Sequence, residues 1–280
     1  MTKINKVTIK GKVKILETDD ENIVIKKKNK DMSSLFNYLE IRGIDSFPKV
    51  EEETRDEIKY KYYDEKHILN QDSDEEFIRK VADIHYKTTY FKDVSRKKYK
   101  DIYNTLIDNI DYLKDYYNDF VRKADMETYM SPSNYLLLRN FSILNSSFYY
   151  LEKELNSWYN LVKDKTKERV TIVHNNLRKD NYLESDNGIL TGWENYMVDT
   201  PVLDIYKLYK NEYKSLDFKS LYKVYNDTFT LTKEETKLFF IMISIPKKLE
   251  KSDNELNNVI ETKKMIDYMY RTNDFIKNHL

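Results

Sequence analysis

The sequence of 280 residues contains no cysteine. This absence excludes disulfide bonds, thiol catalysis and cysteine-ligated zinc. Glycine is almost as scarce: only four occur, where an average composition would give about twenty. A glycine-rich phosphate loop needs several glycines close together, so that backbone N–H groups can approach phosphate oxygens. The sequence therefore offers no such loop.

Net charge is also absent, because 48 Lys and Arg residues balance 48 Asp and Glu residues. The two signs are interspersed, so electrostatics gives no reason to expect binding to nucleic acid or to an anionic membrane. The N-terminus has no apolar core of signal-peptide length, and the most apolar window, residues 238–245, is far too short to span a bilayer. We therefore expect a cytoplasmic protein without a nucleic-acid or membrane partner.

Apolar residues are plentiful, at 40% of the chain, and in its first quarter they follow a strand-like pattern. Residues 4–28 alternate apolar and polar side chains and predict a hairpin followed by a third strand. Residues 33–43 predict a short amphipathic helix that ends at Gly43 as its C-cap. Two further strands are predicted over residues 47–53 and 56–63. Together these segments predict a small sheet with one helix.

From about residue 73 the apolar side chains recur at helical spacing, beginning with DEEFIRKVADIHYKTT. The β-branched segment RVTIVHNN and the turn DNG (186–188) predict one short hairpin among the helices. Thr232, followed by acidic residues, predicts a helix N-cap. After the helix that starts near residue 73, we predict further helices over residues 95–124, 133–166, 202–213, 216–228, 232–244 and 254–279.

The order of these segments predicts the fold class. A run of strands followed by a run of helices is typical of α+β proteins. We predict a small β-rich N-terminal lobe over residues 1–70 and a large, mainly helical C-terminal lobe over residues 71–280. A ligand is expected in the cleft between the lobes.

Three short motifs occur in this order along the chain. The first is NIVIK (22–26), a strand in which Val24 and Lys26 share one face by the period of two. The second is VHNNLRKDN (173–181), in which an Asn follows the His by seven residues. The third is GILTGWENYMVDTPVLDIYKLY (188–209). Each motif alone is weak, whereas their order and spacing together are informative.

These motifs resemble the aminoglycoside phosphotransferase and choline kinase-like branch of the protein-kinase fold. Within that branch the likeness is greatest to the CotS-type spore coat proteins of endospore-forming bacteria. Ile23–Lys26 takes the places of V-A-I-K, VHNNLRKDN those of H-x-D-x-x-x-x-N, and GWE those of D-W-E. The segments 38–50, 81–89 and 225–249 also resemble passages of this family, so the likeness covers most of the chain. It implies a two-lobed protein-kinase-like fold.

The resemblance also implies nucleotide-binding roles for two residues of the third strand. Val24 would cover the adenine, and Lys26 would reach the phosphates. The helix that follows has no clear Glu to pair with Lys26, because Glu40 stands at its far end. The glycine-rich loop is missing as well.

In the matched catalytic positions, two acids are replaced. Asn176 stands at the general-base position, where an amide cannot take a proton. Gly192 stands where the family's principal magnesium-binding Asp would be. Asn181 keeps the metal-side Asn, and His174 keeps the loop His, for which a structural hydrogen-bonding role is favoured over catalysis. Since Mg²⁺ is usually held by one or two carboxylates plus substrate phosphates, we expect no metal site.

Two other carboxylates could compensate for the missing acids. Glu194 lies two residues past Gly192 and is expected on the same strand face. Asp180 lies in the loop beside Asn181. Both are weak candidates, because Glu194 matches the family's own D-W-E Glu and Asp180 is expected to be a solvated loop residue.

We weigh three functions. The favoured one is a pseudokinase, a kinase-like scaffold that transfers no phosphate, needs no cofactor and acts through other proteins. If the CotS-type likeness holds, those partners are spore coat proteins and the location is the spore coat. The alternative is a divergent phosphotransferase that uses ATP and Mg²⁺ to phosphorylate a hydroxyl group of an amino alcohol, sugar or antibiotic. A third is a module that binds a nucleotide or metabolite in the cleft without chemistry.

Overall fold

The computed structural model describes residues 4–10, 13–19, 21–28, 30–63, 71–184 and 188–279. The chain forms two compact units, and each is built from separate segments. Unit 1 comprises Met1–Tyr90, Thr171–Asp199 and Leu221–Thr230; unit 2 comprises Phe91–Val170, Thr200–Ser220 and Leu231–Leu280. The predicted lobe boundary at residue 70 falls within residues 64–70, which lie outside the described residues. Gly11 and the first two residues of the predicted DNG turn also lie outside them.

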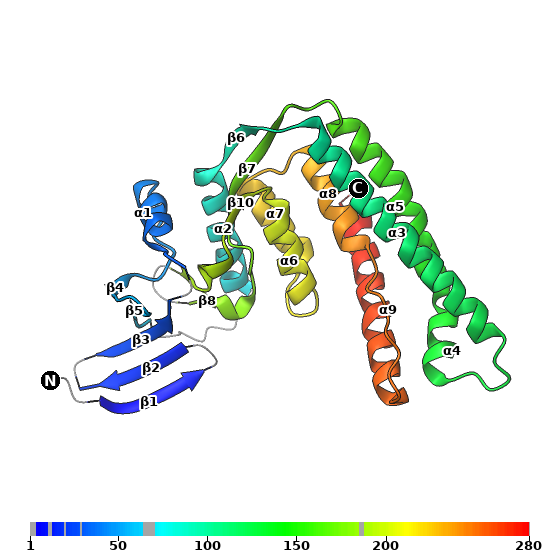
Figure 1. The fold of residues 1–280 in the computed structure, drawn as a ribbon, viewed down its shortest axis with the longest axis horizontal. Helices are drawn as coiled ribbons and strands as arrows, with labels where there is room; N and C mark the ends of the chain where they lie inside the picture. The colour runs from blue at the N-terminus through cyan, green and yellow to red at the C-terminus, as the bar shows by residue number, and fades with distance from the viewer. Residues whose placement is uncertain are drawn as a thin grey trace. The chain divides into compact units, whose positions relative to one another are not determined.

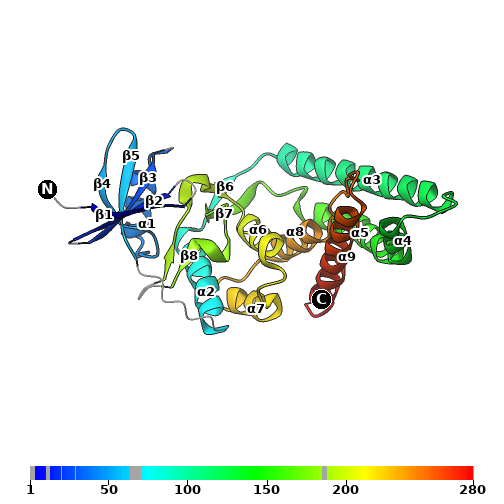
Figure 2. The ribbon, with the colours of Figure 1, turned by 90° about the horizontal axis from the view of Figure 1, so that it is seen from below.

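Unit 1 contains a five-stranded antiparallel sheet, as the alternating pattern near the N-terminus predicts (Figures 1 and 2). Its strand order is β1-β2-β3-β5-β4. The strands are β1 (Ile4–Lys10), β2 (Val13–Thr18), β3 (Asn22–Lys27), β4 (Val50–Glu53) and β5 (Glu57–Lys61).

The register of the central strands decides which side chains share a face. Val13 lies opposite Lys26 and Ile15 lies opposite Val24. On the other side of β3, Tyr60 of β5 lies opposite Val24. Because directly opposed residues point to the same side of a sheet and side chains alternate along each strand, these five side chains form one continuous surface.

Two helices belong to unit 1 in full. The first, α1 (Ser33–Ile41), ends as predicted: Gly43 has a φ of +66° and its N–H donates to the carbonyl of Glu40 at 2.9 Å. This left-handed conformation is one that glycine adopts without steric cost. The second, α2 (Gln71–Thr88), buries Phe77 and Ile78.

Between segments that belong to unit 2, the chain forms the short strands next to the motifs of residues 173–181 and 188–209. β7 (Lys167–Val173) pairs with β10 (Met197–Asp199), and β8 (Tyr182–Leu183) pairs with β9 (Ile189–Leu190), both antiparallel. Two single 3₁₀ turns separate them, at Lys179–Asn181 and Trp193–Asn195. The second sheet, in the order β10-β7-β6, also contains β6 (Tyr90–Asp93).

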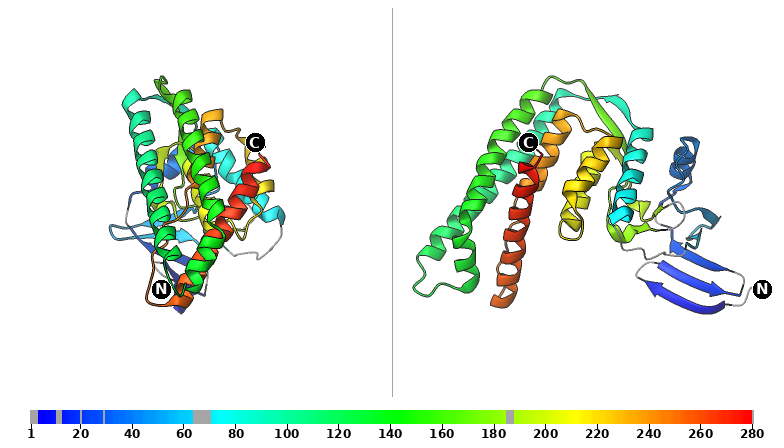
Figure 3. Two further views of the ribbon diagram at one scale, coloured as in Figure 1. Left: turned by 90° about the vertical axis from the view of Figure 1, so that its right-hand side faces the viewer. Right: turned by 180° about the vertical axis from the view of Figure 1, so that it is seen from behind.

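Unit 2 is helical. The long helices α3 and α5 run side by side (Figure 3), and α8 packs on α5 and α6. Its core includes the fully buried side chains of Tyr117, Phe148, Trp158, Tyr209 and Phe239. The helices of unit 2 are α3 (Arg96–Asp125), α4 (Pro132–Arg139), α5 (Phe141–Val162), α6 (Val202–Glu212), α8 (Lys233–Ser244) and α9 (Glu255–Lys277). Helix α7 (Phe218–Thr228) is divided: its residues before Leu221 belong to unit 2 and the rest belong to unit 1.

One helix prediction is wrong. The segment 133–166 is two helices, because the chain turns at Asn140, whose φ of −108° and ψ of 10° are not helical. The Asn140 side chain donates to the carbonyl of Leu136 at 2.8 Å, a local bond that competes with helix continuation. The short strands β6 and β10 were also not predicted, since three or four residues give no clear period.

No helix among the described residues has both the length and the apolar character needed to cross a membrane.

The start of α8 is fixed by a reciprocal cap. The backbone N–H of Glu235 donates to Thr232 Oγ1 at 3.4 Å, and the backbone N–H of Thr232 donates to the Glu235 carboxylate at 2.8 Å. This capping box confirms the predicted N-cap. The same carboxylate accepts from Arg169 Nε at 3.0 Å, and both charged side chains are largely shielded from solvent. Glu235 therefore joins the helix start to β7.

We predict that Thr232→Ala lowers the free energy of unfolding by about 1 kcal/mol, the usual cost of losing a cap. Glu235→Gln should cost more, because it also leaves the largely buried Arg169 without this carboxylate. Urea unfolding at 25 °C measures both. Thr228→Ala, an exposed change at the end of α7, is the control and should change stability by less than about 0.5 kcal/mol. Equal stability of Thr232→Ala and Thr228→Ala would contradict the role of the cap.

Candidate functional site

A cavity of about 320 Å³ lies within unit 1, a size in the usual range for small-molecule sites. One wall is the sheet surface formed by Val13, Ile15, Val24, Lys26 and Tyr60. The other contains the motifs of residues 180–194. The remaining lining residues are Met32, Phe36, Pro48, Lys61, Tyr62, Tyr63, Asp180, Asn181, Leu183, Thr191, Gly192, Trp193 and Glu194.

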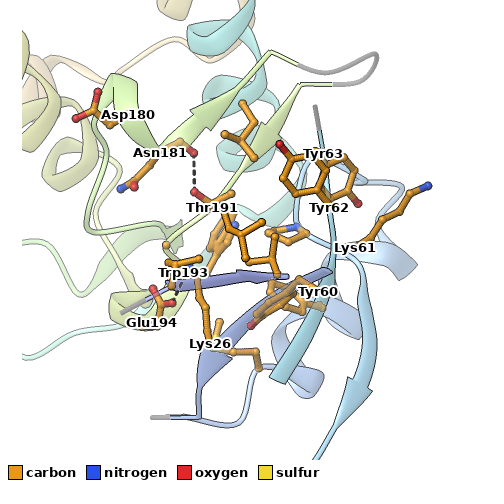
Figure 4. Close-up of a pocket in the computed structure, with 18 residues that line it drawn as sticks. Lys26, Tyr60, Lys61, Tyr62, Tyr63, Asp180, Asn181, Thr191, Trp193 and Glu194 are labelled. Carbon is orange, nitrogen blue, oxygen red and sulfur yellow. Dashed lines mark hydrogen bonds and ion pairs between the residues drawn. The ribbon is translucent and has the colours of Figure 1, made fainter. Parts of the chain in front are cut away.

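The two walls are joined by polar contacts within unit 1. Lys26 Nζ lies 3.3 Å from Glu194 Oε1, and Figure 4 shows the two side chains pointing toward each other. The backbone N–H of Leu190 donates to the carbonyl of Ser46 at 2.9 Å. Lys26 thus has an acidic partner, but that partner comes from the WEN segment, whereas Glu40 of α1 is exposed.

The environment of Glu194 favours its charged form. Burial acts to raise the pKa of the Glu194 carboxyl, but the Lys26 ammonium and the hydrogen bonds that the carboxylate accepts outweigh it, so the pKa lies below its usual value of 4.5. The expected strand geometry is wrong here: residues 193–195 form a 3₁₀ turn, so Gly192 and Glu194 do not share a strand face. Glu194 nevertheless reaches the cavity.

His174 is a buried, hydrogen-bonded residue at the end of β7. Its Nε2–H donates to the carbonyl of Thr191 at 2.9 Å, and its ring meets Trp193 edge-on at 4.6 Å. The indole N–H of Trp193 donates to the carbonyl of Leu190 at 2.7 Å. His174 does not line the cavity, and these contacts connect the VHNN segment to the GWE segment.

Asn176 and Asn181 are linked to each other through the loop backbone. The Asn181 amide Nδ2 donates to the carbonyl of Asn176 at 2.8 Å. The Asn181 carbonyl accepts from the backbone N–H of Thr191 at 2.8 Å. Asn181 lines the cavity, whereas Asn176 does not. The side-chain amide of Asn181 thus holds the loop in place from inside the cavity wall.

Gly192 has a backbone that favours glycine. Its φ is +85°, in the left-handed region, and a Cβ at this position would lie 3.2–3.3 Å from the side-chain amide of Asn181. An added side chain would therefore carry a backbone cost and would also require Asn181 to move. The space beside Gly192 is occupied by Asn181.

These residues do not fit a magnesium–phosphate site of the kinase type. Gly192 offers no side-chain ligand, and Asn181 supplies at most a neutral amide oxygen. The Glu194 carboxylate is engaged with Lys26. Asp180 is exposed, and in Figure 4 its carboxylate lies at the outer end of the loop, away from both Lys26 and Glu194. Since Mg²⁺ is usually held by carboxylates together with phosphates, we derive no metal-dependent step.

The sequence predictions missed much of the cavity wall. Tyr60 is buried, and its burial together with the Glu194 charge raises its pKa to about 12. Tyr62 and Tyr63 line the cavity directly after β5. The sequence contained a signal for two of these residues. Tyr60 and Tyr62 stand two positions apart at the end of a predicted strand and are therefore expected to point to the same side of the sheet. Val13 and Ile15 could likewise have been found from their period of two.

We predict that Lys26 and Glu194 are coupled and that the coupling depends on pH. Because the pKa of Glu194 is depressed in the folded protein, the pair stabilises the fold above pH 4.5, and this stabilisation is lost as the pH falls through the lower folded pKa. The stability difference between the wild type and Glu194→Gln should be constant from about pH 7 to pH 5 and shrink below that. With Glu194 more than one third exposed, at 37%, its size should not exceed about 1 kcal/mol.

A double-mutant cycle with Lys26→Gln, followed by urea unfolding at each pH, tests this coupling. In the Lys26→Gln background, the pH-dependent effect of Glu194→Gln should be smaller, because the other groups that lower the pKa of Glu194 remain. A pH dependence that persists undiminished without Lys26 would assign the depressed pKa to other groups.

We predict that Gly192→Ala destabilises the protein more than Gly43→Ala. Both positions have positive φ, which costs about 1–2 kcal/mol for an alanine. At Gly43 a Cβ would meet nothing within 4 Å, whereas at Gly192 it meets the Asn181 amide. Thermal and urea unfolding of the two variants separate the steric contact from the backbone cost. Equal losses would mean that Asn181 adapts without cost.

No family model matches the sequence, and no curated protein does. Solved structures do match. An aminoglycoside phosphotransferase from Alicyclobacillus acidocaldarius superposes with a TM-score of 0.67 at 10% identity, over 99% of this chain and 93% of that chain. An AMP-bound spectinomycin phosphotransferase gives 0.50 at 11% identity, over 98% and 88%. The choline kinase LicA from Streptococcus pneumoniae gives 0.44 at 13% identity, over 99% and 94%.

At these identities the likeness establishes the fold alone. The first superposition covers nearly the whole of both chains, and the small antiparallel sheet and the helical remainder agree with it. The predicted fold class, a two-lobed α+β fold of the protein-kinase-like type, is therefore confirmed.

Proposed function

We propose that this chain is a pseudokinase, a kinase-fold protein that binds a ligand in the unit 1 cavity and transfers no phosphate. One observation carries the proposal: neither position where the kinase-like resemblance places an acid carries one. Asn176 stands at the base position, and a Cβ at Gly192 would lie 3.2–3.3 Å from the Asn181 amide, which itself bonds to the carbonyl of Asn176. A phosphotransferase needs a base for the attacking hydroxyl and a carboxylate for the metal at such positions.

The chemistry of the walls supports a ligand with a flat apolar part. Val13, Ile15 and Val24 give an aliphatic surface, and Tyr62 and Tyr63 add aromatic rings. A purine base fits such walls, and Lys26 and Lys61 are the cations of the lining. Because Glu194 pairs with Lys26 and Gly192 offers no carboxylate for Mg²⁺, a nucleotide would bind weakly and would gain little from Mg²⁺.

The wider role in this proposal is that of a scaffold acting through other proteins. The resemblance of VHNNLRKDN and the following segments to CotS-type proteins supports spore coat proteins as partners and the spore coat as its location. With no catalysis to perform, the cavity would serve to hold the scaffold in one conformation when a ligand is bound.

A divergent phosphotransferase is the second candidate, because two carboxylates, Glu194 and Asp180, do line the cavity. The similar structures include an aminoglycoside phosphotransferase and a choline kinase. In this function the two carboxylates would hold Mg²⁺, ATP would be the donor, and the acceptor would be an alcohol. Lys26 would have to leave Glu194 for the phosphates.

Thermal unfolding with ATP, ADP or GTP, each with Mg²⁺ or with EDTA, separates the two functions. We predict a shift that is the same with and without Mg²⁺. A ligand at 100 times its Kd stabilises by about 2.7 kcal/mol, which corresponds to several degrees at most for a chain of this length. No phosphate release above the uncatalysed rate is expected. A Mg²⁺-dependent shift, or ATP turnover that Lys26→Ala abolishes, would instead establish the phosphotransferase.

A back-substitution adds a second test. The double variant Asn176→Asp and Gly192→Asp restores both missing acids, with the steric cost at Gly192 described above. A former enzyme is expected to gain Mg²⁺-dependent nucleotide binding from these acids, whereas an active divergent enzyme should gain nothing. Asn195→Asp, an exposed change in the nearby 3₁₀ turn, controls for an added charge.

A further inference from the structure

A second cavity, of about 430 Å³, lies within unit 2. It is formed by α3, α6 and the end of α8, and it shares no residue with the cavity of unit 1. Its lining residues are Leu106, Asn109, Tyr112, Leu113, Tyr206, Lys210, Met242, Ile245, Pro246 and Lys248.

The charges of this lining have one sign. Lys210 and Lys248 are its charged residues, and no carboxylate lines it. Lys247, beside the cavity, pairs with Glu261 at 3.2 Å. The other lining side chains are aliphatic or aromatic, apart from one amide. An electropositive, largely apolar hollow of this kind complements a molecule that joins an anionic group to an apolar body.

Lys210 is the lining residue whose surroundings most favour the binding of an anion. Its ammonium lies 5.7 Å from the centre of the Tyr206 ring and 5.5 Å from that of Tyr268, close enough for cation–π attraction. In the part of the chain that the structure describes, no carboxylate lies within ion-pair distance of it. Burial, together with the charge of Lys247, lowers the pKa of Lys210. A partly buried ammonium without an anion is costly, and an incoming anion would offset that cost.

Lys248 is placed to assist. Its ammonium donates to the hydroxyl of Tyr112 at 2.6 Å and lies 5.2 Å from the centre of the same ring. This leaves further N–H donors on Lys248, because an ammonium carries three. Tyr112 is itself a lining residue, so the bond keeps the second cation beside the cavity.

We propose that the unit 2 cavity binds a small organic anion, an aromatic carboxylate or phosphate ester, whose charge meets Lys210 and Lys248 and whose ring packs on Tyr206 and Met242. The proposal concerns unit 2 alone and does not depend on the function proposed for unit 1.

Methionine NMR can report on the two cavities separately, because Met242 lines one and Met32 lines the other. The full chain labelled with [methyl-¹³C]methionine would be titrated with 1-naphthoate, and in a second series with phenyl phosphate. We expect the Met242 methyl signal to shift saturably while the Met32 signal stays in place. The neutral analogue 1-naphthalenemethanol should bind at least about tenfold more weakly, as expected when a charge-assisted bond is lost.

Two variants locate the charge. Lys210→Gln should weaken 1-naphthoate binding about tenfold or more, and Lys248→Gln should weaken it less, because one N–H donor of Lys248 is already bonded to the Tyr112 hydroxyl. Lys263→Gln, an exposed change on α9, is the matched control and should leave the affinity unchanged. Circular dichroism and thermal unfolding of each variant verify the fold.

Several results would overturn the proposal. If the neutral analogue binds as tightly as 1-naphthoate, the cavity is only an apolar hollow. If Lys210→Gln folds and keeps the wild-type affinity, the anion is bound elsewhere. If Met32 shifts and Met242 does not, the anion occupies the unit 1 cavity. Each of these results leaves the nucleotide measurements on unit 1 unaffected.

Discussion

The register of three antiparallel strands is the constraint on which the unit 1 cavity depends. Lys26 faces the cavity because it lies opposite Val13, and Val24 faces it because Ile15 and Tyr60 lie on either side. A slip of one residue in β3 would turn Val24 and Lys26 to the opposite face of the sheet. The cavity wall, the Lys26–Glu194 pair and the position of the WEN segment would then be lost together.

The same wall explains how a kinase-like fold can persist without the kinase acids. Removing one partner of a buried polar pair usually leaves the other group unpaired, at a cost in stability. Here Glu194 compensates Lys26, and Asn181 fills the space beside Gly192. These internal contacts pair the Lys26 ammonium and the Asn181 amide without a ligand.

The sequence predicted the fold well where patterns were long. The strands before residue 63, the C-cap at Gly43 and the capping box at Thr232 followed from local chemistry. The break at Asn140 was missed, because a single side-chain bond to the backbone outweighed a continuous helical pattern. At the site, the motifs identified Val24, Lys26, Asn181 and Gly192 as a group. They could not identify Glu194 as the partner of Lys26, since that contact joins residues 168 positions apart.

The division of each unit into separate chain segments has a consequence for biosynthesis. The sheet wall of the unit 1 cavity is complete once β5 is made, but residues 180–194 emerge only after all of α3, α4 and α5. Until then, Val13, Ile15 and Val24 expose their apolar face on the nascent chain. Contacts so distant in sequence form slowly, and exposed strands of this kind are prone to aggregation in the meantime. A chain with this order of segments therefore exposes an apolar sheet face for longer during synthesis than a chain whose two cavity walls are adjacent in sequence.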